Sequence, residues 1–180
     1  MSEMPATARA LNHVAYQTCD TAATYRFYTE VLGFKLVAAV RGKHDPESGT
    51  DKPHLHTFFA MRSGEVIAFF DLAGVDAPPK DHLPGWVRHF AMSVDSHEEL
   101  LAWRRRLKSF GVEVTPVVDH DGVWQSIYFM DPNRVVLELT YQARDLTEAD
   151  ADNAQKLMQE WLTERSADSG VGNGQRKAQG

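Results

Sequence analysis

An internal repeat constrains the fold of this chain more than any other feature of its sequence. Residues 12–17, Asn-His-Val-Ala-Tyr-Gln, precede a helical pattern that ends at Gly33. Residues 88–93, Arg-His-Phe-Ala-Met-Ser, precede a second helical pattern that ends at Gly111. In each copy a short strand with one histidine near its start leads into a helix, and glycine after a helix is typical of a left-handed C′ residue. The repeat therefore predicts two modules of the same topology.

The patterns around each helix define the predicted module. The first helix is expected to begin after the capping residue Asp20, and the second after Ser96, where Ser96 and Glu99 form a Ser-x-x-Glu capping box. Three strand patterns follow each helix, at residues 34–40, 56–61 and 65–72 in the first copy and at 112–118, 125–130 and 135–141 in the second. We therefore predict an α+β fold of two βαβββ modules whose strands form a cupped, mixed or antiparallel sheet.

The segments outside the two modules have their own composition. A stretch rich in proline and glycine separates the modules, residues 41–53 are predicted to be a polar loop, and an amphipathic helical pattern precedes a tail rich in glycine, serine and polar residues. The predicted units are a first module at residues 8–75, a linker at 76–85, a second module at 86–142, a C-terminal helix at 147–166 and a disordered tail at 167–180.

Composition excludes several classes of function. The formal net charge is −6, and the only basic run, residues 104–106, is interpreted as a solvated helix face, so no nucleic-acid partner is expected. No apolar run approaches the roughly 18 residues of a membrane span, and residues 1–11 lack the pattern of a signal peptide. The single cysteine, Cys19, excludes an intrachain disulfide. We therefore expect a cytoplasmic protein without a membrane partner.

Strand alternation places three polar side chains where a metal ion could bind. His13 and His89 each lie among small or polar neighbours on one face of their strand, and Glu138 occupies the matching face of the last strand. The opposite faces are strongly apolar and must pack under the helices. An unpaired imidazole or carboxylate inside a cupped sheet is costly, and a bound metal or mutual pairing removes that cost. Two neutral imidazoles and one carboxylate suit a divalent transition metal.

A longer pattern surrounds Glu138. Residues 118–138 contain His120, a spacer, an aliphatic residue followed by Tyr128, then Asp-Pro, a short spacer and Glu138. With the repeat, these residues resemble the vicinal oxygen chelate superfamily, the group of glyoxalase I, fosfomycin- and bleomycin-resistance proteins and extradiol dioxygenases. The resemblance covers residues 8–142, and the pattern is most similar to that of single-unit type I extradiol dioxygenases. Arg134 departs from it, because glycine or proline is usual at that position of the turn.

The resemblance implies a metal-containing site with named roles. The ligands would be His13, His89 and Glu138, holding Fe(II), with Mn(II) or another divalent metal as the alternative. His120 would act as the acid/base that handles protons on the substrate, and Tyr128 would donate a hydrogen bond to a substrate oxygen.

Glyoxalase I, by resemblance, has a fourth protein ligand at the end of its first module, and this chain differs there. That position falls at Phe69 or Phe70, neither of which binds metal, although Asp71 is close by and stays open as an alternative. Both phenylalanines are candidates for an apolar wall of the substrate pocket, and His56 is a further candidate for binding substrate.

These residues favour an Fe(II)-dependent extradiol-type dioxygenase that cleaves a catechol-like aromatic ring with O2. One chain is expected to assemble the site by itself and to form a homodimer. Two alternatives remain open: another metal-dependent glyoxalase-like enzyme, such as an isomerase, epimerase or thiol transferase, and a resistance-type protein that sequesters an aromatic ligand without turnover.

Overall fold

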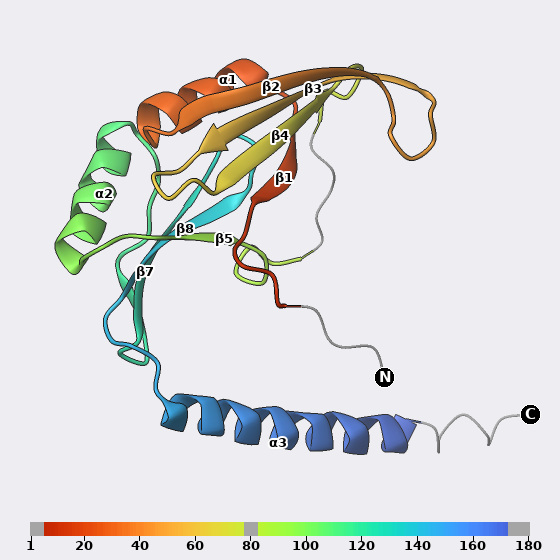
Figure 1. The fold of residues 1–180 in the computed structure, drawn as a ribbon. Helices are drawn as coiled ribbons and strands as arrows, with labels where there is room; N and C mark the ends of the chain where they lie inside the picture. Colours follow the sequence, from red (N-terminus) through yellow and green to blue (C-terminus); the bar gives the residue numbers. More distant parts are fainter. Residues whose placement is uncertain (1–5, 78–82, 173–180) are drawn as a thin grey trace, which may run out of the picture.

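The two predicted modules are present as two separate four-stranded sheets, each with its own helix (Figure 1). The structure is a computed structural model that describes residues 6–77 and 83–172, with side chains described up to residue 166. Its elements are β1 (His13–Thr18), α1 (Thr21–Arg26), η1 (Phe27–Val31), β2 (Lys35–His44), β3 (Asp51–Ala60), β4 (Val66–Leu72), β5 (Phe90–Ser93), α2 (His97–Ser109), β6 (Val118–His120), β7 (Trp124–Met130), β8 (Val136–Gln142) and α3 (Glu148–Gly172).

Both sheets have the same strand order, which confirms the predicted α+β fold of βαβββ modules. The N-terminal sheet has the order β1-β4-β3-β2 and the C-terminal sheet the order β5-β8-β7-β6. In each, the first strand pairs in parallel with the last, and the other pairs are antiparallel. The first strand of each module, β1 or β5, therefore lies at a sheet edge. The candidate histidine His13 is the first residue of β1, and His89 directly precedes β5.

The helix boundaries agree with the sequence signals. Asp20 accepts a hydrogen bond from the backbone N–H of Ala23 at 2.8 Å, and Ser96 accepts one from Glu99 at 3.1 Å. The Glu99 carboxylate in turn accepts the backbone N–H of Asp95 at 2.7 Å, one residue before the predicted partner in the capping box. The glycines that follow the two helices both have positive φ, +72° and +74°, as a left-handed C′ residue requires.

The predicted polar loop at residues 41–53 is wrong, because most of it is strand. β2 continues to His44 and β3 begins at Asp51, so the two strands form a long hairpin. The turn is closed by Asp45, whose carboxylate accepts backbone N–H groups of Glu47 and Ser48, and Gly49 has φ +69°. Glycine and proline in this stretch suggested a loop, but backbone pairing across the hairpin outweighs their weak strand propensity.

The second module departs from the prediction in its first strand after α2. Residues 112–117 contain only an isolated bridge from Val114 to Phe129, and the strand β6 begins at Val118. Pro116 lacks a backbone N–H and cannot continue a ladder, and Thr115 instead bonds to the backbone of Tyr128 through its side chain and its N–H.

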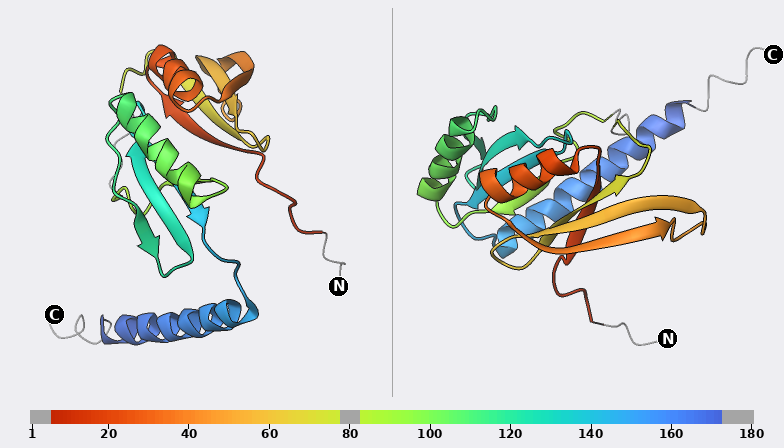
Figure 2. Two further views of the ribbon diagram at one scale, coloured as in Figure 1. Left: turned by 90° about the vertical axis from the view of Figure 1, so that its left-hand side faces the viewer. Right: turned by 90° about the horizontal axis from the view of Figure 1, so that it is seen from above.

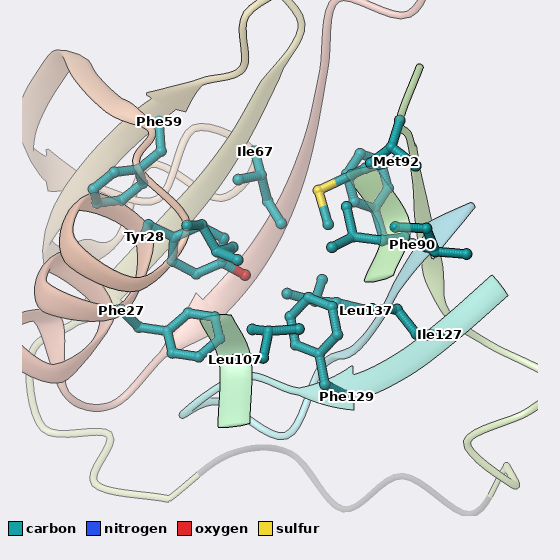
Figure 3. Close-up of a cluster of buried hydrophobic side chains, with 14 of the residues drawn as sticks. Phe27, Tyr28, Phe59, Ile67, Phe90, Met92, Leu107, Ile127, Phe129 and Leu137 are labelled. Carbon is teal, nitrogen blue, oxygen red and sulfur yellow. The ribbon is translucent and has the colours of Figure 1, made fainter. Parts of the chain in front are cut away.

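The apolar faces of the two sheets contribute to one core. Figure 3 shows Tyr28, Phe59 and Ile67 of the first module opposite Phe90, Met92 and other residues of the second. Tyr28 and Ile67 are fully buried, as are Leu107 of α2 and Leu137 of β8. Since the apolar faces meet in this core, the opposite, polar faces of both sheets lie on the outside of it.

Polar contacts also join the modules at the turn after β7. The Tyr28 hydroxyl donates to Asp131 at 3.0 Å, and the same carboxylate accepts the backbone N–H groups of Asn133 and Val135. Burial raises the pKa of the Asp131 carboxyl, and these donors oppose that effect. Arg134, where glycine or proline is usual, has φ +67°, which explains the usual preference for glycine there.

The basic run is more than a solvated face. Arg106 donates to the backbone carbonyls of Glu30 and Val31 at the end of η1, at 2.7 and 2.8 Å, and Arg104 donates to the carbonyl of Thr115. Two of the three arginines are therefore used to hold elements together, one of them across the two modules.

The C-terminal helix α3 projects from the end of β8 and lies apart from both sheets in Figure 1 and in the left view of Figure 2. It continues to Gly172, past residue 166 where the predicted helix ends, and the rest of the predicted tail, 173–180, lies outside the described residues. Its large apolar side chains Leu157, Met158, Trp161 and Leu162 are each at least 50% exposed. No described helix is long and apolar enough to cross a membrane.

Candidate metal and substrate site

The outer face of the C-terminal sheet gathers four of the predicted site residues. Glu138 lies in β8 between Ala91 of β5 and Tyr128 of β7 in the strand register, so all three residues are on the same face. His89 directly precedes β5, and His120 ends β6. Alternation along four paired strands thus brings residues from distant parts of the sequence to one surface.

His89 and Glu138 form a direct pair. The His89 Nε2 lies 2.8 Å from the Glu138 carboxylate, whose side chain is only 8% exposed while that of the histidine is 30% exposed. A carboxylate this buried needs a partner, and the imidazole supplies one. The pair brings an imidazole nitrogen and a carboxylate oxygen to one point, and both atom types are ligands of divalent transition metals.

Tyr128 and His120 form a second pair beside the first. The His120 Nε2 lies 2.9 Å from the Tyr128 hydroxyl. The Tyr128 ring meets the His89 ring edge to face, with 5.6 Å between centroids. Burial, followed by the neighbouring Glu138 charge, raises the pKa of the Tyr128 hydroxyl, which keeps it protonated and able to donate. The four side chains therefore form one continuous polar group.

His13 lies elsewhere, on the edge strand of the N-terminal sheet. Its Nδ1 pairs with the Asn12 side chain at 2.7 Å, and its ring meets that of Phe58 edge to face. In the part of the chain that the structure describes, no three His, Cys, Asp or Glu side chains come close enough to hold a metal ion. The structure thus joins His89 and Glu138 but does not bring His13 to them, and the expected assembly of the site by one chain is not seen.

The outer face of the N-terminal sheet carries His56 and Phe70. Their rings are stacked, with centroids 3.6 Å apart and planes inclined by 17°. Phe69 points to the opposite face, where it is fully buried in the core, which leaves Phe70 and not Phe69 accessible to a ligand. Asp71 lies on the same side as Phe69 and accepts a hydrogen bond from Thr21 of α1.

Sequence reasoning missed two further members of this face, His54 and Phe58. His54, His56 and Phe58 alternate along β3, so strand alternation was the signal that places them together. Phe58 lies in the predicted strand at residues 56–61 but was not considered as a ligand contact, and His54 lies before the predicted start of that strand, whereas β3 begins at Asp51.

Comparison with known proteins places the chain in a family. The profile of the Glyoxalase/Bleomycin resistance protein/Dioxygenase superfamily matches residues 10–139, which include both modules. The chain belongs to this superfamily. The match confirms the resemblance to vicinal oxygen chelate proteins at the level of the superfamily. It does not distinguish extradiol dioxygenases from the other members. No curated protein sequence matched the chain.

Solved structures of the glyoxalase superfamily share the fold. A domain of this superfamily from Frankia sp. EAN1pec is 22% identical, with 76% of this chain and 99% of that chain covered and a TM-score of 0.61. Lactoylglutathione lyase from Agrobacterium tumefaciens is 20% identical, with 74% and 94% covered and a TM-score of 0.53. At these identities the likeness concerns the fold alone.

The third structure contains a metal. A mutant of the fosfomycin resistance protein FosX from Listeria monocytogenes, in complex with Mn(II) and 1S,2S-dihydroxypropylphosphonic acid, is 23% identical. The alignment covers 78% of this chain and 96% of that chain, with a TM-score of 0.53. A divalent metal is thus present in at least one protein of this fold.

Proposed function

We propose that this superfamily member is an Fe(II)-dependent extradiol-type dioxygenase that opens a catechol-like ring with O2. The observation that carries the proposal is the hydrogen bond between His120 and Tyr128 directly beside the His89–Glu138 pair. An acid/base and a phenol donor next to two metal-ligand atoms suit a reaction in which a chelated diol must lose and regain protons.

The donor set fits Fe(II), with Mn(II) as the alternative. His89 and Glu138 would hold the metal, and His13 would supply the third ligand, which gives two imidazoles and one carboxylate with positions left for substrate. Bound Fe(II) would supply the redox chemistry that allows O2 to react with the diol.

We further propose that His13 comes from a second copy of the chain. Within one chain, the shared core holds the two sheets by their apolar faces, so His13 and the His89–Glu138 pair lie on separate outer faces. The edge strands β1 and β5 are unpaired on one side in the described structure. Edge strands are ready sites for association. In a symmetric homodimer, the first module of one copy can face the second module of the other, and two equivalent sites form.

The protein side chains would manage protons and orientation. His120 would take a proton from one diol hydroxyl and return it as the ring opens, while Tyr128 would hold a substrate oxygen by a hydrogen bond. The overall reaction balances without another reactant, because the bond between a hydroxylated ring carbon and its non-hydroxylated neighbour breaks and both atoms of O2 enter the product.

The experiment is single-turnover ring opening by the iron-loaded protein, together with oxygen uptake across a catechol panel. We expect His120→Ala to keep its iron and to lose roughly 10²–10⁴-fold in rate, as general acid–base roles do. Tyr128→Phe should lose about ten- to a hundredfold if its hydroxyl bonds a buried substrate oxygen.

Ring opening at the wild-type rate in His120→Ala would contradict the extradiol assignment. Metal without any ring opening would favour another glyoxalase-like reaction, and a protein that binds aromatic compounds without metal would favour ligand sequestration.

A further inference from the structure

His56 carries an unsatisfied polar atom in an aromatic environment. Its Nε2 is buried and has no hydrogen-bond partner, and it is the one such side-chain nitrogen or oxygen among the described residues. The ring lies between Phe58, at 4.1 Å between centroids, and Phe70, at 3.6 Å. A buried polar group without a partner costs about 1–3 kcal/mol, so a ring orientation in which this nitrogen meets a partner is favoured.

The surroundings of His56 form a continuous row of rings along the outer face of the N-terminal sheet. From Phe58 the row continues to His13, at 5.9 Å between centroids, and from Phe70 it continues to His54, at 5.6 Å. We call these five rings the aromatic row. Because it includes His13, the row connects the candidate metal ligand with His56.

The sequence allows this row at a specific point. The neighbouring strand β2 has a glycine, Gly42, opposite His54, and a Cβ there would lie 2.3 Å from two atoms of the His54 ring. Any other residue at position 42 would displace the ring. Gly42 therefore leaves the room that the His54 ring occupies at the end of the row.

A ring that is partly exposed can present its nitrogen to the open side of the sheet. A half-turn of the imidazole about its Cβ–Cγ bond exchanges nitrogen and carbon positions with almost no change in shape, so stacking on Phe70 is kept. The aromatic neighbours favour a planar ligand, and the imidazole favours a hydrogen-bonding group on that ligand.

We propose that His56 is a specificity-determining residue that hydrogen-bonds a polar substituent on the aromatic ring of the substrate. The substituent would be a hydroxyl, carbonyl or similar uncharged group, placed on the ring away from the two oxygens that chelate the metal. This inference rests on the proposed function, because the diol would bind at the metal beside His13.

The test measures binding and not turnover. Zn(II) has no redox chemistry, so a Zn(II)-loaded protein under nitrogen binds catechols without opening them. The probes are hydroxymethylcatechol and ethylcatechol, each in both of its ring isomers, because the two substituents have nearly the same size and differ in one hydroxyl. Titration calorimetry gives the ratio of the two dissociation constants for each protein.

The variants separate the nitrogen from the ring. We expect wild type to prefer hydroxymethylcatechol, and His56→Phe, which keeps a stacked ring, to reduce that preference by roughly three- to tenfold. His56→Gln should restore part of it, because the amide can also bond a hydroxyl. The matched control is His44→Phe, the same substitution in the same hairpin at a side chain that is 60% exposed and paired with Asp51.

Each outcome decides between the two proposals. An unchanged preference in His56→Phe overturns the role of His56, whether or not the iron-loaded protein opens rings. A preference that depends on His56 without any ring opening keeps the role of His56 and removes the extradiol reaction. If neither catechol binds to the wild-type protein, both proposals fail.

Discussion

At the scale of single residues, Tyr28 joins the two modules through both its ring and its hydroxyl. Its ring is fully buried among residues of both modules, and its hydroxyl is a donor to the buried Asp131 carboxylate. Burial and the Asp131 charge raise the pKa of the Tyr28 hydroxyl well above its ordinary value, so it stays protonated and able to donate at neutral pH.

We therefore expect Tyr28→Phe to lower the free energy of unfolding by about 1–3 kcal/mol, because the carboxylate loses a donor that it cannot replace in the core. Urea unfolding followed by fluorescence measures the change. Tyr25→Phe is the matched control, since Tyr25 is one turn away and 45% exposed. Equal stability of the two variants would show that the bond to Asp131 contributes nothing.

The candidate site shows what single residues can and cannot predict. The repeat identified His89, and strand alternation placed Glu138 and Tyr128 on its face, because these relations depend only on the period of a strand. The separation of His13 from this pair was not predictable, since it depends on how two apolar sheet faces pack in a shared core. Phe69 and Phe70 were assigned the same role, although adjacent strand residues point to opposite faces.

At the scale of elements, local chemistry was predicted well and strand ends were not. The caps at Asp20 and Ser96 and the glycines after both helices follow from backbone bonding within a few residues. The extent of the β2–β3 hairpin and the late start of β6 depend on pairing with other strands. Pro116 was the local sign that the strand predicted at residues 112–118 is interrupted before β6 begins. The periodicity of apolar residues therefore predicts which helices and strands form, whereas the ends of the strands depend on their pairing with other strands.

The start of α3 offers a test at this scale. Thr147 and Asp150 form a capping box, in which the backbone N–H of each residue donates a hydrogen bond to the side-chain oxygen of the other. Arg144 donates to both oxygens of the Asp150 carboxylate at 2.8 Å. Arg144 first, and then Thr147, hold the pKa of that carboxyl well below its ordinary value. The contribution of the charged carboxylate to stability is therefore complete above the unfolded pKa of about 4, and it is lost as pH falls from there toward the lowered pKa of the folded protein.

Asp150→Ala should therefore fray the first turn of α3 at neutral pH and leave the two sheets unchanged. Hydrogen exchange of the amides in that turn should become faster, because the backbone N–H of Thr147 and the first turn lose the side-chain acceptor that caps them. Asp152→Ala removes a charge from the same helix without touching the cap and should leave the exchange rate nearly unchanged. Equal protection in both variants would mean that the cap does not hold this end of the helix.

At the scale of the whole molecule, the two modules are covered on their apolar faces and open on their polar ones. The open faces carry the His89–Glu138 pair on one sheet and His13 with the aromatic row on the other. One copy thus holds the candidate ligands on two separate faces. In the proposed dimer, a second copy that places its first module over the second module of its partner would cover both faces at once and bring the candidate ligands together.

This arrangement predicts complementation between two defective chains. His13→Ala and His89→Ala should each fail to retain iron as homodimers, because every site lacks one ligand. In a mixed dimer of the two, one site combines both substitutions, but the other combines the intact His13 of one chain with the intact His89 and Glu138 of its partner. Mixed dimers purified through two different tags should therefore recover about half of the wild-type iron content, as expected for a symmetric dimer with two shared sites. If the site were formed within one chain, both sites of the mixed dimer would be defective and its iron content would stay as low as that of either parent.

The control is a mixed dimer of the wild-type chain and a double variant that carries both His13→Ala and His89→Ala. If the sites are shared, each of its two sites lacks one histidine ligand and no iron is retained. If each site is formed within one chain, the wild-type chain keeps its own intact site and its iron.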